Sequence, residues 1–285
     1  MHELGLSGGK INFLFDLLSY SVLALVIPFI AQFLFKEKEK AFLFALSLLV
    51  FPALFNTLNP LLFWVGQYLV FSEALAYLTM PLYSFLPYAR TPEPQLSYVL
   101  IAILTYLALR LKSVLPLLLA IPFCYSFVSL PLSFLIIAIV LRQHCRVRSV
   151  YGVMFLSFLA VGLIGFVYCN FLMTEEAQAH LVSTRFPMIS LTGILSVGVY
   201  GLIRHKLTSE MRVFSLLLAF SPLAASNVQV LSGFLAQPNN VEDFWGVLVI
   251  AFLTGLWLAQ YPARCKMCLC LAVFLSSLMG LGLIN

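Results

Sequence analysis

The stretch INFLFDLLSYSVLALVIPFIAQFLF, residues 11–35, decides the fold class of this chain. It is an apolar run of about 25 residues with a single charged side chain, Asp16, and about 20 apolar residues are enough for a helix to cross a bilayer. The alternating charges KEKEK of residues 36–40 follow it directly. Because a helix satisfies its own backbone hydrogen bonds in lipid, this pattern predicts a transmembrane helix that ends in a charged turn.

The rest of the sequence repeats this composition. Of its 285 residues, 62% are apolar and 9% are charged, and the mean hydropathy is +1.03. Ordinary soluble domains contain about 25% charged residues, so this chain has too little polar surface for a water-soluble fold. The composition excludes a soluble globular enzyme, a nucleic-acid-binding domain and a disordered tail. We expect an all-α, polytopic membrane bundle that forms one transmembrane domain over residues 1–285, without a soluble domain.

Apolar runs alternate with short polar segments along the whole chain. The runs cover residues 11–35, 41–71, 97–109, 113–141, 149–172, 187–203, 213–225, 244–260 and 267–284. Basic residues gather in 142–148, 204–212 and 261–266, whereas 173–186 and 226–243 are mainly acidic. Because basic loops stay in the cytoplasm, the first three segments are predicted inside and the other two outside. Both termini then lie outside, and we expect a bacterial inner membrane.

Two arrangements are open for the first half of the chain. In one, 41–71 is a single kinked span, and 113–141 is a hairpin or re-entrant pair broken at prolines. In the other, the turn at Asn59-Pro60 divides 41–71 into two helices, and 113–141 is one tilted span. Both imply about ten membrane-embedded segments. The Tyr- and Pro-rich stretch 72–96 is typical of an interfacial helix followed by a loop.

The most distinctive polar segment is 226–245. It contains three Asn, two Gln, a Glu and an Asp between two apolar runs. Carboxamides offer both a donor and an acceptor to sugar hydroxyls, and Phe244 and Trp245 offer apolar faces. A polar outer loop with helix caps would explain the same composition structurally. The residues of this segment that we predict to bind substrate are Asn227, Gln229, Ser232, Gln237 and Glu242.

The pattern Asn227-x-Gln229-x-x-Ser232-Gly233, followed by Gln237-Pro238 and Glu242-x-Phe244, resembles a segment of uncharacterised bacterial multi-spanning proteins. Those proteins are similar to C-type glycosyltransferases, which use lipid-linked sugars. The resemblance covers about twenty residues. It implies a polytopic fold that works at the outer leaflet on a polyprenyl-phosphate-linked sugar.

The chain departs from that group in its acidic residues. C-type glycosyltransferases carry an Asp-x-Asp or similar catalytic motif in the first outer loop. This chain contains only two Asp, Asp16 and Asp243, and no such motif. Whether the chain is itself catalytic therefore stays open at the level of the sequence.

Three other residues are the predicted catalytic candidates. Asp16 lies within the first span, where an ionised carboxylate is energetically unfavourable. A carboxylate at such a position is a functional candidate, and Asp16 could act as a general base or a cation ligand. A hydrated side chain that caps or pairs is the structural alternative. Glu176 and His180 are four residues apart, so on a helix they would share a face as an acid–base pair. Arg185, in the same loop, is predicted to bind a lipid phosphate. A solvated charged loop would explain Glu176, His180 and Arg185 equally well.

Metal and nucleotide chemistry find no support in the sequence. Cys265-x-x-Cys268 has no second pair and no neighbouring His, so we predict no zinc site. Glycine-rich nucleotide loops are absent. We expect no cofactor and no metal.

These patterns leave three functions. The first is a multi-pass protein that handles a lipid-linked sugar or surface-glycan precursor at the outer face, glycosyltransferase-like or polymerase-like. The alternatives are a transporter or flippase, which would use broken helices and midplane polar residues, and a non-catalytic scaffold subunit. Expected partners are membrane lipids, a polyprenyl-phosphate-linked sugar and a membrane protein subunit, and not nucleic acid.

Overall fold

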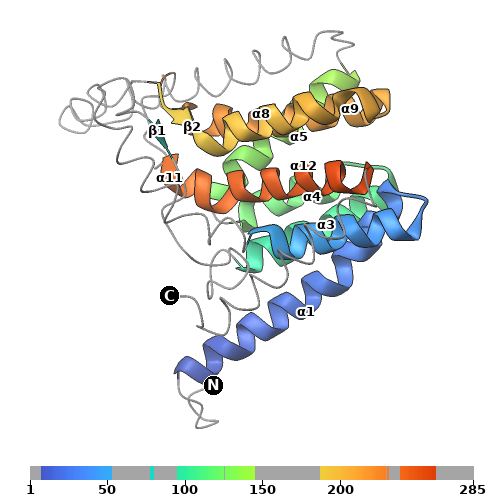
Figure 1. Cartoon of the computed structure of the whole chain (residues 1–285). Coiled ribbons are helices and arrows are strands. Elements are labelled where there is room, and N and C mark those ends of the chain that lie inside the picture. Colours follow the sequence, from blue (N-terminus) through green and yellow to red (C-terminus); the bar gives the residue numbers. More distant parts are fainter. Residues whose placement is uncertain are drawn as a thin grey trace, which may run out of the picture. The chain divides into compact units, whose positions relative to one another are not determined.

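The computed structural model describes residues 8–52, 78–79, 95–124, 126–144, 187–228, 230 and 238–260, and most of them are helical (Figure 1). The chain divides into two compact units. The first unit takes its residues from Met1–Leu58, Tyr83–Ser129 and Thr254–Asn285, and the second from Asn59–Leu82 and Leu130–Leu253. The predicted all-α class is confirmed for the described residues.

A long N-terminal helix organises the first unit. This helix, α1 (Gly8–Leu34), continues through Pro28 and packs along α3 (Gln95–Leu111). At their contact the ring centroid of Tyr106 lies 6.1 Å from that of Phe29 and 5.8 Å from that of Phe33. Aromatic pairs at such separations add to the area that the helices bury.

The charged residues after α1 form a turn into the next helix, 38–52. In this turn Lys40 Nζ donates to Glu37 Oε1 at 2.6 Å. The helix 38–52 returns against the chain before it, with the rings of Phe35 and Phe44 5.5 Å apart. The turn of alternating charges that the sequence predicted after residue 35 is therefore present.

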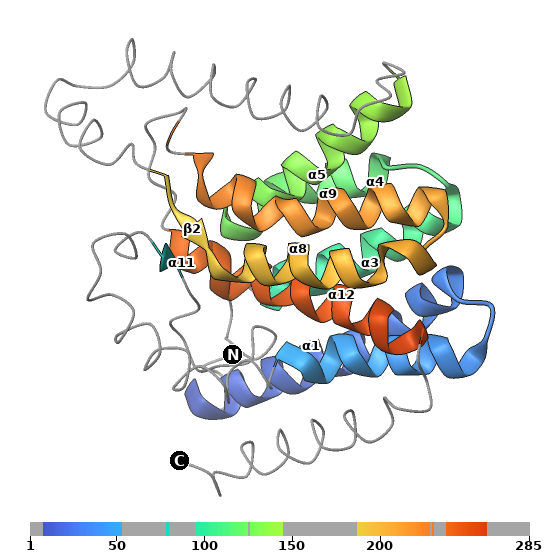
Figure 2. The same ribbon diagram turned by 45° about the horizontal axis from the view of Figure 1, so that its top comes forward.

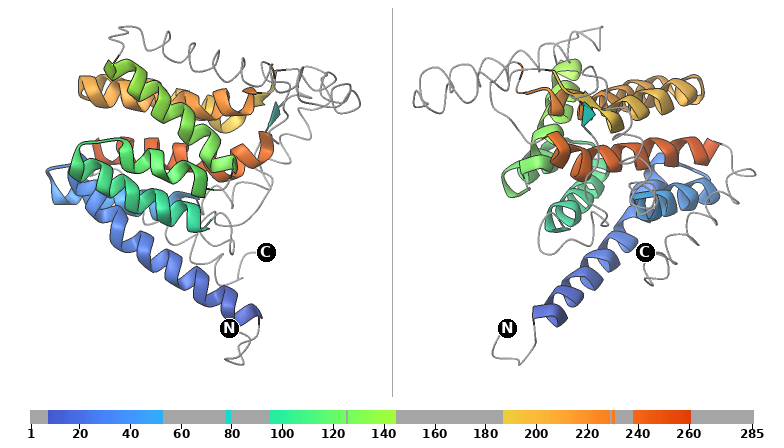
Figure 3. Two further views of the ribbon diagram at one scale, coloured as in Figure 1. Left: turned by 180° about the vertical axis from the view of Figure 1, so that it is seen from behind. Right: turned by 60° about the vertical axis from the view of Figure 1, so that its left-hand side comes forward.

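The stretch 113–141 is broken into separate helices. α4 (Leu115–Ala120) leads into the 3₁₀ turn η4 (Ile121–Phe123), Cys124 is extended, and α5 (Ser126–His144) begins a new helix. Figure 3 shows α4 beside α3 within the first unit. A single continuous helix over 113–141 does not form, because α4 ends at Ala120 and the chain is extended at Cys124. A break in this stretch belongs to the first of the two arrangements. Its other features, a single kinked span over 41–71 and a hairpin or re-entrant pair over 113–141, stay predictions, and residues 53–71 lie outside the described part of the chain.

The second unit is built around an antiparallel helix pair. β2 (Ile189–Ser190) pairs in parallel with β1 (Leu78–Thr79) and leads directly into α8 (Leu191–Ile203). The 3₁₀ turn η6 (Arg204–Lys206) connects it to α9 (Ser209–Ser226). Figures 1 and 2 show α8 and α9 side by side.

Hydroxyl caps set where these two helices begin. Ser190 Oγ accepts from Gly193 N–H at 2.9 Å, and Thr208 Oγ1 accepts from Met211 N–H at 3.4 Å. Such caps satisfy backbone N–H groups that have no partner within the helix.

The C-terminal helical stretch starts with an unusual turn. α11 (Pro238–Val241) is followed by the π-helical turn η7 (Glu242–Gly246) and by α12 (Val247–Gln260). Within the second unit the rings of Phe214 and Phe252 lie 5.9 Å apart. The part of α12 that belongs to the first unit packs Leu258 against Leu43.

Among the described residues, two helices are long and apolar enough to cross a membrane, Leu14–Leu34 and Glu242–Gln260. A shorter apolar helix covers Gln95–Leu111. The first helix presents large apolar side chains at its surface, with Leu18 62% and Leu25 66% exposed. About ten segments, the single transmembrane domain and the orientation stay predictions, and the runs 149–172 and 267–284 lie outside the described residues.

Two glycines provide a matched test of the packing in the second unit. A Cβ at Gly246 would lie 1.9 Å from Thr192 Oγ1, whereas a Cβ at Gly198 would meet nothing within 4 Å. We expect Gly246→Ala to lower the free energy of unfolding by about 1–3 kcal/mol through overpacking. Gly198→Ala should raise it by up to about 1 kcal/mol, because alanine favours the helix. Thermal unfolding of the purified variants in detergent measures both, and equal midpoints would contradict the packing.

Candidate functional site

Glu242 is the centre of a buried polar cluster in the second unit. This Glu242 cluster also contains Thr192, Ser221 and Trp245. The side chain of Glu242 is fully buried in η7, and its Oε2 accepts from Thr192 N–H at 2.9 Å and from Thr192 Oγ1–H at 2.5 Å. Thr192 is the second residue of α8, where backbone N–H groups lack helical partners and the helix dipole favours a negative charge. The carboxylate thus serves as a cap that comes from a different helix.

Two further contacts explain why η7 approaches α8 and α9 so closely. Gly246 lies against the Thr192 side chain, where any Cβ would collide. On the other side, Trp245 Nε1–H donates to Ser221 Oγ at 2.7 Å, and the Ser221 hydroxyl donates to Leu218 O at 2.7 Å. π-Helical turns are rare and often occur at functional sites. Here the turn is fastened to α8 through Glu242 and to α9 through Trp245.

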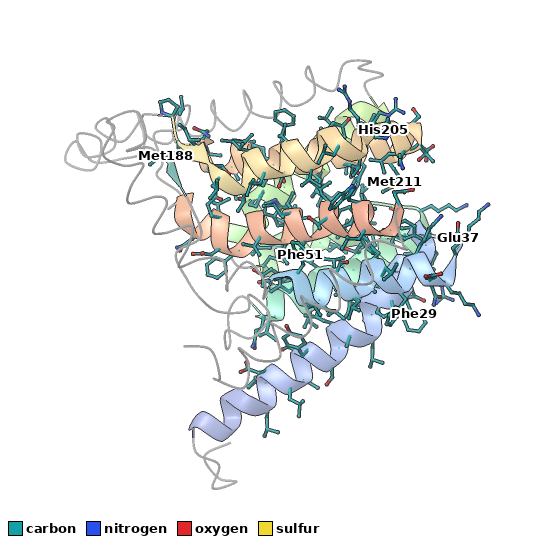
Figure 4. The ribbon with its side chains drawn as sticks, in the orientation of Figure 1. Phe29, Glu37, Phe51, Met188, His205 and Met211 are labelled. Carbon is teal, nitrogen blue, oxygen red and sulfur yellow. The ribbon has the colours of Figure 1, made fainter. Side chains whose placement is uncertain are left out.

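Asn227 lies at the C-terminal end of α9 and acts as a clamp. Its Oδ1 accepts from Met188 N–H at 2.7 Å, and its Nδ2 donates to Met188 O at 2.9 Å and to Leu223 O at 2.8 Å. Figure 4 shows Met188 at this end of the α8–α9 pair. A carboxamide has two N–H groups and two carbonyl lone pairs. Among the described residues, one lone pair of Oδ1 has no donor, and the binding role of Asn227 stays a prediction.

The end of the predicted outer loop differs from the expectation. Residues 238–243 are helical, and Glu242 and Asp243 are buried where the sequence suggested an open polar segment. Phe244 and Trp245 are buried as well, so their faces pack within the protein. The physical reason is the contact of η7 with α8 and α9, which no local pattern encodes. The predicted binding role of Glu242 remains untested.

A second polar contact lies in the first unit. Gln95, the first residue of α3, donates through Nε2 to Asp16 Oδ1 in α1. Gln95 is 1% exposed, and its Oε1 makes no hydrogen bond among the described residues. In the same helix as Asp16, the Tyr20 hydroxyl donates to Leu49 O at 3.5 Å. Asp16 thus has a hydrogen-bond partner in α3, and its role as a base or cation ligand stays a prediction.

Gln95 was not among the residues predicted from the sequence. A lone glutamine at the edge of an apolar run belongs to no chemical motif. Its only signal is its position directly after Pro94 and just before the apolar run that forms α3. A polar side chain there is a candidate for pairing with the only carboxylate of the first span.

The remaining predicted site residues lie outside the described part of the chain. They are Glu176, His180, Arg185, Gln229, Ser232 and Gln237. Cys265 and Cys268 lie outside it as well. Within the described ranges, no group of three His, Cys, Asp or Glu side chains is placed to hold a metal ion. Of the predicted residues, the structure places Asn227 and Glu242 in the second unit and Asp16 in the first.

No family model matches the sequence, and no curated protein or solved structure matches it significantly. The relationship to glycosyltransferase-like membrane proteins is thus a prediction from residues 226–245 alone.

The cap formed by Glu242 can be tested by stability. Glu242→Ala leaves the N–H and hydroxyl of Thr192 without acceptors, and each unsatisfied buried group costs about 1–3 kcal/mol. Glu242→Gln keeps an acceptor oxygen and should retain most of the stability. Glu210 of α9 is exposed, so Glu210→Ala is the matched control, with an expected change under about 1 kcal/mol. Equal thermal unfolding of the two alanine variants in detergent would disprove the cap.

Proposed function

We propose that this chain is a multi-pass protein of a bacterial inner membrane that binds a lipid-linked sugar or surface-glycan precursor at its outer face. The exposed apolar side chains of α1 support the membrane location. Leu14, Leu18, Leu25 and Phe29 are each at least half exposed, and contiguous apolar surface of this kind is unfavourable in water. Lipid tails are the environment that suits such a helix.

The observation that carries the proposal is the position of the buried polar cluster around Glu242. The residues that resemble the glycosyltransferase-like proteins, from Asn227 to Glu242, begin and end at the same end of the α8–α9 pair. Asn227 holds the residue before β2, and Glu242 caps α8 a few residues later. A pattern that looks like a polar loop in the sequence therefore begins and ends on one polar region of the second unit.

Sugar recognition needs groups that both donate and accept hydrogen bonds. Among the described residues, the buried hydroxyl of Ser226 makes no hydrogen bond, and the Oδ1 of the adjacent Asn227 accepts only one. These two groups support a hydroxyl-rich ligand at this end of α9. Catalysis, if the chain performs it, would fall to Asp16, Glu176 or His180 as predicted from the sequence.

The membrane orientation is part of the proposal. α8 is 13 residues long, about 20 Å at the rise of a helix, with the Glu242 cluster at its start and the basic residues of η6 just after its end. Basic turns remain on the cytoplasmic side. The Glu242 cluster would then lie on the outer side.

The decisive experiment is deletion of the gene in its own host, with complementation. We expect lipid-linked sugar to accumulate and surface glycan to be lost, and both effects to be reversed by the wild-type gene. Transfer of labelled sugar by the purified protein would then identify an enzyme, and transfer across the bilayer without covalent chemistry would identify a flippase. Unchanged pools of both lipid-linked sugar and surface glycan would overturn the proposal.

Variants in the complementing gene locate the activity. Gln229→Ala and Arg185→Ala should fail to restore surface glycan while the protein still accumulates in the membrane. Gln32 is an exposed amide on α1, so Gln32→Ala is the matched control and should restore it fully. Asn227→Ala is less informative, because loss of its three hydrogen bonds also destabilises the fold. Full restoration by both test variants would remove the predicted site from the proposal.

A further inference from the structure

We propose that the turn between α8 and α9 is a binding site for the headgroups of anionic phospholipids. The turn carries Arg204, His205 and Lys206 in η6 and Arg212 in the first turn of α9, and all four are exposed. The sole acidic residue of 204–212 is Glu210. Figure 4 shows His205 and Met211 together at this end of the helix pair. The surface has an excess of positive charge, which is complementary to a phosphate-bearing headgroup.

Arg212 is held in place by the turn itself. Its Nε donates to Arg204 O at 3.0 Å, and its Nη2 donates to Leu207 O at 3.4 Å. A guanidinium has five N–H donors, so three of them make no hydrogen bond within the described part of the chain. The backbone contacts fix the plane of the guanidinium, which reduces the conformational entropy lost when it binds a phosphate. The start of α9 beside it adds backbone N–H groups that favour an anion.

An exposed apolar strip of α8 leads to this turn. Ile194, Leu195, Gly198, Gly201 and Leu202 are all exposed, and their spacing places them on one face of the helix. Leu202, two residues before Arg204, is 61% exposed. A Cβ would meet nothing within 4 Å at either glycine. The strip offers apolar surface for an acyl chain, and the basic turn offers charge for its headgroup.

The turn after α1 provides the internal comparison. Residues 36–40 contain three Lys, but two Glu alternate with them, and Lys40 is paired with Glu37 at 2.6 Å. Its positive charge is therefore largely compensated within the turn. The turn 204–212 has no such alternation, since Arg204, His205 and Lys206 are consecutive. The two turns carry similar numbers of cations with different net charge.

This inference rests on the proposed membrane orientation but not on the proposed glycan function. Thr192, where Glu242 binds, and Arg204 are separated by the length of α8, about 18 Å at 1.5 Å per residue. The predicted orientation places the turn on the cytoplasmic side, where anionic phospholipids attract basic segments. We therefore assign the phospholipids of the bilayer, rather than a polyprenyl phosphate, to this surface.

The test is native mass spectrometry of the full-length protein in detergent, titrated with phosphatidylglycerol or with phosphatidylcholine. We expect tighter binding of phosphatidylglycerol, and a loss of that binding of about fivefold for each neutralised side chain. Arg204→Gln combined with Lys206→Gln is the test variant, and Lys36→Gln combined with Lys38→Gln is the matched control. The control should bind as the wild type does.

Several outcomes would overturn the inference. These are equal binding of the two phospholipids by the wild type, equal loss in the test and control variants, and displacement of phosphatidylglycerol by an equal concentration of a polyprenyl phosphate. Thermal unfolding checks that both double variants are folded. If the test variant unfolds, the binding of phosphatidylglycerol to the wild type is compared at low and high salt. A charge-driven contact must weaken in high salt. Salt-independent preference would also contradict the proposal.

Discussion

The interaction on which the second unit depends is the bond between the buried carboxylate of Glu242 and the start of α8. A charged or polar group that leaves water for an apolar interior must find partners, or the fold loses several kcal/mol. Thr192 supplies two donors from one residue. The bond fixes η7 against α8, and Trp245 then reaches Ser221 on α9. The neighbouring helices α8 and α9 and the later turn η7 are thereby held together at one polar region.

The same constraint operates in the first unit with other residues. Asp16 lies within an apolar helix, and Gln95 from the start of α3 donates to it. The aromatic contacts of Tyr106 with Phe29 and Phe33 lie further along the same two helices. A polar bond near one end and ring contacts near the other define how α1 and α3 align. In each unit a buried polar side chain thus joins two elements: Gln95 joins α3 to α1, and Glu242 joins η7 to α8.

Much of the helical framework could be predicted from the sequence. The run 11–35 lies almost wholly in α1 and the run 97–109 lies within α3, as expected for apolar stretches whose backbone a helix satisfies internally. Pro122 indicated a possible break in 113–141, but the sequence left both a broken and a continuous helix open. The helical state of 238–243 was not predicted, since Asn239, Asn240 and the acidic pair are typical of a loop. Contacts with α8 and α9 outweigh that local preference.

The candidate site, too, could be predicted from the sequence only in part. Glu242 and Asn227 were selected as polar residues in a distinctive segment, yet the sequence could not tell that both bind backbone groups of a neighbouring element. Gln95 carried no motif and was recognised only through its contact with Asp16. By itself the sequence determined the all-α class, the apolar helices and the positions of charged turns, because these follow from local composition and periodicity. Only the tertiary structure decided which polar groups meet, because a hydrogen bond between residues 50 positions apart depends on how the helices pack.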